Sequence, residues 1–245
     1  MLPAIEAVRA DRGWLLDTCA GLTHDDWQAP SGCPGWRVQD VVAHLGALFW
    51  ATVDPGRLPD VTGMPTEQAQ EIWVRARSGL APDAVLADYK EVSEIALGEL
   101  AKLAALDLEV PLGDLGTYPA AVLPAAYGFD HYVHIRADLF APRGPLAGTP
   151  PPSDEVRLGT ALDWIETAIA QQNPAAAAAG SYDLQVLGPC ARIISFGSGQ
   201  AMATVSSGAE AFVRWVTQRG SWEELGVQAE GDEAALAAAR TLKVF

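Results

Sequence analysis

Three side chains of this sequence have the types and the spacing of a divalent metal site. Asp130 and His134 stand four residues apart, and His44 lies far upstream in the middle of an apolar stretch. Residues at positions i and i+4 share one face of an α-helix, about 5–6 Å apart at Cβ. One carboxylate and one imidazole can therefore reach the same ion while a facing helix supplies His44. Three protein ligands leave a coordination position open, which is typical of catalytic rather than structural sites.

The neighbours of this pair leave two questions open. His131 is a reserve ligand, but on an ideal helix it projects about 100° away from Asp130. We therefore place Asp130 and His134 first. Arg136 and Asp138 follow His134 and either support the site or form an exposed ion pair.

Composition narrows the classes of partner. The chain has 245 residues, 49% of them hydrophobic, and its 31 acidic residues outnumber 16 basic ones to give a net charge of −15. Such a surface repels phosphate backbones and anionic lipid, so we expect a small-molecule substrate and no nucleic-acid or membrane partner. Nothing in the composition indicates an oligomeric state.

The cysteines and the N-terminal residues indicate a cytoplasmic protein. Cys19, Cys33 and Cys190 are few, odd in number and widely spaced, which argues against a disulfide framework and against a zinc site made of thiolates. Cys33, which stands next to Pro34 and upstream of the expected metal helix, could lie near the site, but we expect it to be a small buried residue. The N-terminus is charged and amphipathic rather than signal-like, and no stretch reaches the roughly 18 apolar residues of a membrane span.

The first part of the chain predicts a bundle of helices that can hold the three ligands. Proline and glycine punctuate the apolar periodicity, and the stretch around His44 is apolar on most sides, so its helix is central. Four long helices with one central member describe an up-and-down bundle whose interior can host a metal. The expected helices run over Pro3–Ala20, Val38–Phe49, a segment from Thr66, Pro82–Leu106 and Pro119–Phe140, with a short capped turn at Thr23.

The second part of the chain differs from the first in its composition and in the period of its apolar residues. The segment from Ala141 to Pro152 is rich in proline and glycine and marks a domain seam. A helix over Ser153–Gln172 follows, then a low-complexity alanine run, three short alternating strands and two further helices with one more strand between them. We expect residues 1–150 to form the metal-binding bundle, and residues 151–245 a connecting helix and a small α+β domain.

Three stretches resemble one known family. The stretch C-P-G-W-R-V-Q-D-V-V-A-H-L-G, which contains Trp36 and His44, resembles the motif that opens the DinB-like, mycothiol-dependent maleylpyruvate isomerases of actinobacteria. There a Trp and an amphipathic run precede the first metal His. The segment D-H-Y-V-H-I-R-A-D resembles the later ligand motif of that family, with Asp130 where the isomerases usually carry Glu. The end of the chain, from V-T-Q-R-G-S-W-E-E-L onward, resembles the small sterol-carrier-like domain often attached to these proteins.

The resemblance implies a fold, cofactors and a reaction class. It implies a DinB-like four-helix bundle that holds Zn²⁺ or a similar divalent ion at His44, Asp130 and His134. The ion binds the thiol of mycothiol or another low-molecular-weight thiol, and the enzyme acts as an isomerase or a thiol S-transferase on a small organic substrate. Arg219 resembles the arginine with which such proteins hold a substrate carboxylate, which makes it the candidate catalytic residue. Trp36 is expected to be a packing anchor rather than a substrate platform.

Two other readings of the bundle stay open. One is a biosynthetic enzyme that has kept the bundle without thiol chemistry and catalyses another isomerisation or a cyclisation. The other is a non-catalytic module that binds a metal or an apolar ligand. The metal content of the purified protein discriminates best between these readings and the thiol-dependent enzyme.

Overall fold

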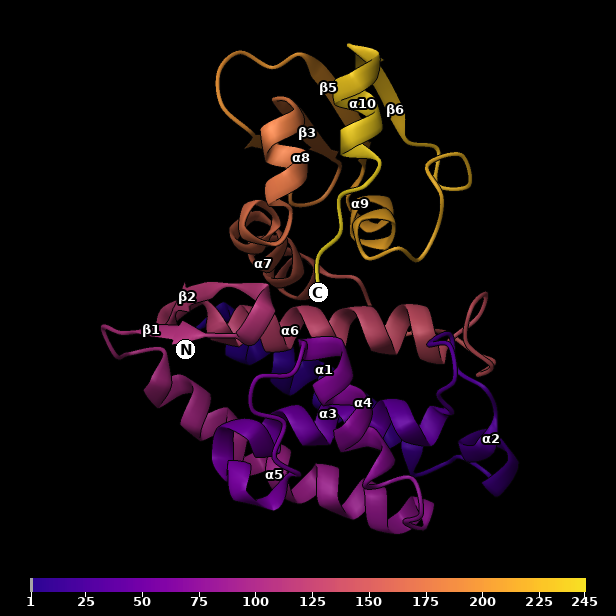
Figure 1. The fold of residues 1–245 in the computed structure, drawn as a ribbon. Helices are drawn as coiled ribbons and strands as arrows, with labels where there is room; N and C mark the ends of the chain where they lie inside the picture. The colour runs from indigo at the N-terminus through magenta and orange to yellow at the C-terminus, as the bar shows by residue number, and fades with distance from the viewer. Residues whose placement is uncertain (1) are drawn as a thin grey trace. The chain divides into compact units, whose positions relative to one another are not determined.

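The computed structural model describes residues 2–245 and divides into two compact units, one ending at Pro152 and the other spanning Ser153–Phe245 (Figure 1). The first unit is helical, and the second combines helices with a small sheet. The predicted fold class, a helical bundle followed by a small α+β domain, is confirmed.

The helices of the first unit begin close to where the sequence places them. Pro3, Val38, Thr66 and Pro82 each open a helix, two of them with proline in the first turn, where a missing backbone N–H costs nothing. The elements are α1 (Pro3–Cys19), α2 (His24–Gln28), α3 (Val38–Val53), η1 (Pro55–Arg57), α4 (Thr66–Arg75), α5 (Pro82–Leu103), β1 (Glu109–Pro111), η2 (Gly113–Leu115), β2 (Thr117–Pro119), η3 (Ala120–Val122) and α6 (Leu123–Val133).

The last helix of this unit differs from the expectation of one helix over Pro119–Phe140. Pro119 closes the antiparallel β1–β2 pair opposite Glu109, and α6 begins at Leu123. At its other end α6 passes into a π-helical turn, η4 (His134–Leu139). Such turns occur mostly within α-helices and often at functional sites.

Helix α3 is central, as predicted. The side chains of Val41, Val42, Leu45 and Phe49 are fully buried, and α3 packs against both α5 and α4. Burying each such side chain stabilises the fold by about 1.5–3 kcal/mol relative to leaving it exposed. The start of α3 is fixed by Asp40, whose carboxylate accepts hydrogen bonds from the backbone N–H and the guanidinium of Arg37.

A buried ion pair fastens α1 to the η4 turn. Both Nη atoms of Arg136 lie 2.9 Å from the carboxylate oxygens of Asp11, and the two side chains are 10% and 1% exposed. The Arg136 guanidinium also lies over the ring of Tyr132. Arg136 is therefore part of the frame of the bundle.

The second unit contains the strands that the sequence predicts. Its sheet has the order β4-β3-β5-β6, in which β3 and β5 are parallel and the other neighbours antiparallel. The alanine run forms a helix, α8, because alanine has the highest helix propensity and Pro174 suits the first turn. Helix α8 packs against α10. The elements are α7 (Glu155–Gln172), α8 (Pro174–Ala179), β3 (Tyr182–Leu187), β4 (Arg192–Phe196), β5 (Ala203–Gly208), α9 (Ala209–Val216), β6 (Gln228–Gly231) and α10 (Glu233–Ala239). Among the helices of residues 2–245, none has the length and apolar character needed to span a bilayer.

Candidate metal centre

The structure brings His44, Asp130 and His134 together inside the first unit. His44 comes from the middle of α3, Asp130 from the last turn of α6, and His134 from the first position of η4. His44 Nε2 lies 3.3 Å from Asp130 Oδ2, and His134 Nε2 lies 3.4 Å from Asp130 Oδ1. One ligand atom from each of the three residues lies within 4.8 Å of the others.

These separations fit ligands around a common ion better than direct hydrogen bonds. A charge-assisted N–H···O bond measures about 2.7–2.9 Å. Nitrogen and oxygen ligands about 2.0–2.2 Å from one tetrahedral zinc ion lie roughly 3.3–3.5 Å apart. In addition, Asp130 Oδ2 is buried and makes no hydrogen bond in the part of the chain that the structure describes. A cation between the three side chains would satisfy that oxygen.

The burial of the three side chains is uneven. The side chain of His44 is 2% exposed, that of His134 is 12% exposed, and that of Asp130 is 21% exposed. His44 is therefore the most deeply buried of the three side chains, and Asp130 is the most exposed. An open coordination position on the solvent side is what a catalytic centre needs.

The electrostatics of the cluster keep its carboxylate charged. Burial opposes the ionised form of Asp130, but the neighbouring imidazoles of His44 and His134 outweigh it and hold the pKa of Asp130 well below its usual range. Burial likewise opposes a charged imidazole at His134, yet Asp130 and the hydrogen-bond partners of the ring raise the pKa of His134 well above its usual value. The site thus favours positive charge next to Asp130.

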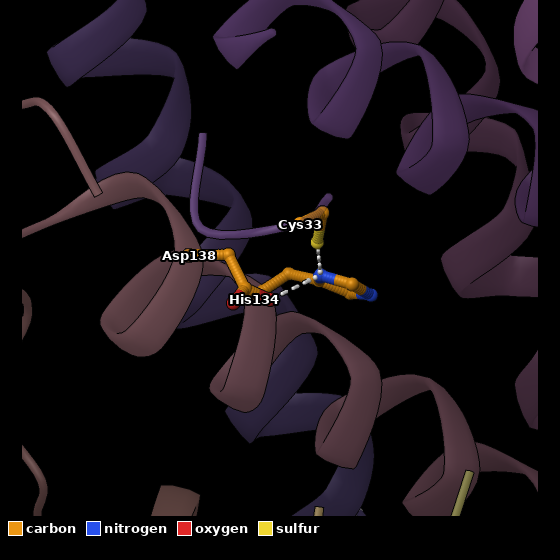
Figure 2. A group of neighbouring side chains, drawn as sticks. All are labelled: Cys33, His134 and Asp138. Carbon is orange, nitrogen blue, oxygen red and sulfur yellow. Dashed lines mark hydrogen bonds and ion pairs between the residues drawn. The ribbon is translucent and has the colours of Figure 1, made fainter. Parts of the chain in front are cut away.

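Asp138 holds the far side of the His134 ring. Its Oδ2 accepts a hydrogen bond from His134 Nδ1 at 2.8 Å, and its side chain is fully buried (Figure 2). A proton on Nδ1 leaves the lone pair on Nε2, which faces Asp130; carboxylates orient metal-binding histidines in this way. Of the two alternatives for Arg136 and Asp138, the structure excludes an exposed pair between them, because Arg136 binds Asp11 instead.

The loop before α3 is docked on η4. The backbone N–H of Gly32 donates to the carbonyl of Asp138 at 2.7 Å, and a Cβ at Gly32 would lie 2.9 Å from the Cα of Asp138. Only glycine allows this approach. The docking places Cys33 Sγ 3.5 Å from His134 Nδ1, with the Cys33 side chain half-buried rather than fully buried as expected.

Trp36 covers the imidazoles as well as packing against the core. Its ring centroid lies 5.1 Å from that of His44, and its ring stacks on His134 at 6.4 Å. Its indole N–H donates to Glu71 Oε2 at 2.7 Å, and this hydrogen bond lowers the pKa of Glu71. Glu71 belongs to no motif that the sequence analysis recognised. Its hydrogen bond with Trp36 depends on the packing of α4 against α3.

The reserve ligand His131 faces elsewhere. Its Nε2 lies 3.0 Å from the hydroxyl of Tyr89 and its Nδ1 lies 2.9 Å from the carbonyl of Tyr127. The side chain is fully buried, and burial lowers its pKa. His131 is thus a hydrogen-bonded core residue in this structure, as its direction on the helix suggested.

Arg219 lies in the second unit, in the turn after α9. Its Nη1 donates a hydrogen bond to the carbonyl of Thr217 at 3.0 Å, and its side chain is half-buried. This arrangement leaves its assignment as the substrate-binding residue a prediction.

Comparisons with known proteins agree with this architecture. The family model described as the mycothiol maleylpyruvate isomerase N-terminal domain matches residues 8–140. The chain is similar to a crystal structure of the mycothiol-dependent maleylpyruvate isomerase, with a TM-score of 0.62 and 20% identity over 94% of this chain and 92% of that chain. A structure of a mutant of that isomerase gives a TM-score of 0.61 at the same identity and coverage. No curated protein matches the sequence. Because the family model covers more than half of the chain, this protein belongs to the mycothiol maleylpyruvate isomerase family.

Proposed function

We propose that the chain is a metal-dependent enzyme that uses mycothiol or a comparable low-molecular-weight thiol, acting as an isomerase or S-transferase on a small organic substrate. The observation that carries the proposal is the convergence of His44 Nε2, His134 Nε2 and the Asp130 carboxylate at 3.3 and 3.4 Å. Membership of the family supplies the thiol and the reaction class. Two imidazoles and one carboxylate form a common ligand set for catalytic zinc.

The residues of this chain divide the work among them. His44, Asp130 and His134 would hold the ion, and Asp138 keeps the Nε2 lone pair of His134 directed at it. The Trp36 ring lies beside both imidazoles, with centroids 5.1 Å from His44 and 6.4 Å from His134. A divalent ion bound there favours the deprotonated, nucleophilic form of a thiol that takes its open position.

The shorter acidic side chain of Asp130 is compatible with the ligand role. Asp130 is one methylene shorter than the glutamate usual in these isomerases, yet its two oxygens already face the two imidazoles at ligand spacing. Asp130 therefore fits the ligand role directly. In the version of the reaction that acts on an acid, Arg219 binds the substrate carboxylate.

Metal content tests the centre. We expect about one zinc-like ion per chain in the wild type, and a loss of that ion in His44→Ala and in His134→Ala. The matched control is His24→Ala, because His24 is an exposed histidine of α2 outside the cluster. Elemental analysis that finds undiminished metal in both cluster variants would remove these residues from the site.

A spectroscopic titration tests the thiol. In the cobalt-substituted protein we expect added mycothiol to produce a thiolate charge-transfer band, because sulfur replaces water at the open position. The Cys33→Ser background excludes a contribution from that nearby thiol. Arg219→Ala should keep the band and raise the Michaelis constant for an acidic substrate. A fully loaded protein that shows no response to millimolar thiol would favour the thiol-free enzyme or the carrier.

A further inference from the structure

The Nδ1 side of His134 carries a second set of donor atoms, and this set includes sulfur. Cys33 Sγ lies 3.5 Å from Nδ1, and Asp138 Oδ2 lies 2.8 Å from it (Figure 2). One atom from each of the three residues lies within 4.8 Å of the others. Cys33 reaches this position from the loop before α3, whereas His134 and Asp138 belong to η4. The three donors therefore meet only when the loop docks on the helix.

We propose that Cys33, His134 and Asp138 bind a thiophilic cation, of the Cd²⁺ or Cu⁺ type, in competition with the centre at His44, Asp130 and His134. A cysteine sulfur selects soft cations, and the nitrogen and oxygen donors of the first centre lack this preference. The proposal concerns a different ion from the proposed function and the other ring nitrogen of His134, Nδ1 instead of Nε2.

The geometry of the second set fits an ion after a small adjustment. Sulfur and nitrogen ligands at about 2.3 and 2.0–2.1 Å from one tetrahedral ion lie roughly 3.6 Å apart, and Sγ and Nδ1 are 3.5 Å apart. Asp138 Oδ2 is at hydrogen-bond distance and has to move outward by about 0.5 Å to reach ligand spacing. Cys33 is half-buried rather than enclosed in the core.

The two sets compete because they share one imidazole. A neutral imidazole has one nitrogen with a lone pair and one with a proton. When an ion binds Nδ1, the ring proton moves to Nε2, which faces Asp130 Oδ1 at 3.4 Å, and the Cys33 thiol releases its proton to solvent. The first centre then keeps two ligands, His44 and Asp130. A thiophilic ion bound at Nδ1 therefore weakens metal binding at the first centre.

The positive charge of Arg143 opposes cation binding by Cys33, His134 and Asp138 only weakly. Its Nε lies 3.8 Å from Asp138 Oδ1, and its Nη2 donates to the carbonyl of Gly32 at 2.7 Å. The Arg143 side chain is 33% exposed, so water screens its charge. The Cys33 thiolate and the Asp138 carboxylate together supply two negative charges against this one.

A cadmium titration of the metal-free, full-length protein tests the proposal. Cadmium alone should produce an ultraviolet thiolate-to-metal charge-transfer band in the wild type, and Cys33→Ser should abolish it. The matched control is Cys190→Ser, because Cys190 is also half-buried but lies in the other unit. His44→Ala should keep the band, since His44 belongs to the first centre alone. A band that survives in Cys33→Ser, or is absent from the wild type, overturns the proposal.

Competition is measured on the zinc-loaded protein. Stepwise cadmium should release zinc from the wild type at concentrations that leave Cys33→Ser loaded, as followed by elemental analysis after gel filtration. Cadmium-113 NMR of the wild type gives a second readout that needs no variant, because a sulfur ligand shifts the resonance strongly. Zinc and sulfur-bound cadmium held together on one chain would refute the sharing of His134. The proposed function fails separately, through unchanged zinc in His44→Ala.

Discussion

Replacing Asp138 tests whether the hydrogen bond behind His134 supports metal binding. Asp138→Ala removes a fully buried, charged acceptor that lies 2.8 Å from His134 Nδ1. A hydrogen bond to a charged group contributes about 1.5–3 kcal/mol. Loss of such a carboxylate partner behind a ligand typically weakens metal binding by about 10–100-fold. The two estimates agree, and we expect the zinc dissociation constant of Asp138→Ala to rise within that range.

Asp138→Asn separates the acceptor from its charge. The asparagine oxygen can still accept from Nδ1, so a neutral hydrogen bond of about 0.5–1.5 kcal/mol remains and the loss of affinity should be smaller than in Asp138→Ala. The assay is competition for zinc with a chromogenic chelator, on variants whose circular dichroism shows a native fold. Asp25→Ala, which removes an exposed carboxylate of α2, is the control. Wild-type affinity in a folded Asp138→Ala protein would refute the argument.

Three further outcomes concern stability and architecture. Arg136→Met should lower the free energy of unfolding by about 3–5 kcal/mol, because the buried Asp11 carboxylate loses the Arg136 guanidinium. Adding Asp11→Leu should recover much of this loss in denaturant titrations. A loss below about 1 kcal/mol in the single variant would contradict the burial argument. Gly32→Ala should cost about 1–3 kcal/mol and weaken zinc binding, because a Cβ there meets the backbone of Asp138; unchanged zinc affinity would mean that the loop does not help position η4. Limited proteolysis should cut first within Ala141–Pro152, where proline and glycine mark a seam, and a first cut inside residues 66–140 would contradict it.

Local signals in the sequence were sufficient for most of the helices. Proline at the first turn, the apolar period and the glycine stops are read within a few residues, so α1, α3, α4 and α5 lie where they were expected. The same local reasoning put Asp130 and His134 on one helix face and His131 on another, which matches their contacts in the structure.

Features that depend on packing between distant segments were missed. The π-helical turn at His134–Leu139 lies where Gly32 docks on Asp138. The composition of neither segment predicts its contact with the other. The half-buried position of Cys33 has the same origin. The β1–β2 pair was missed because its strands are three residues long and carry too few alternating positions to show a period.

The placement of the proposed ligands on separate helices would link metal supply to folding. His44 belongs to α3, whereas Asp130 lies in the last turn of α6 and His134 opens η4, so the unfolded chain offers no preformed site and an ion bound there would favour the native state. Each tenfold rise in free metal above the dissociation constant then adds about 1.4 kcal/mol to the native state. A cell short of metal would hold a less stable protein that is more open to degradation. The steady-state amount of this protein would therefore follow metal availability even without a change in its synthesis.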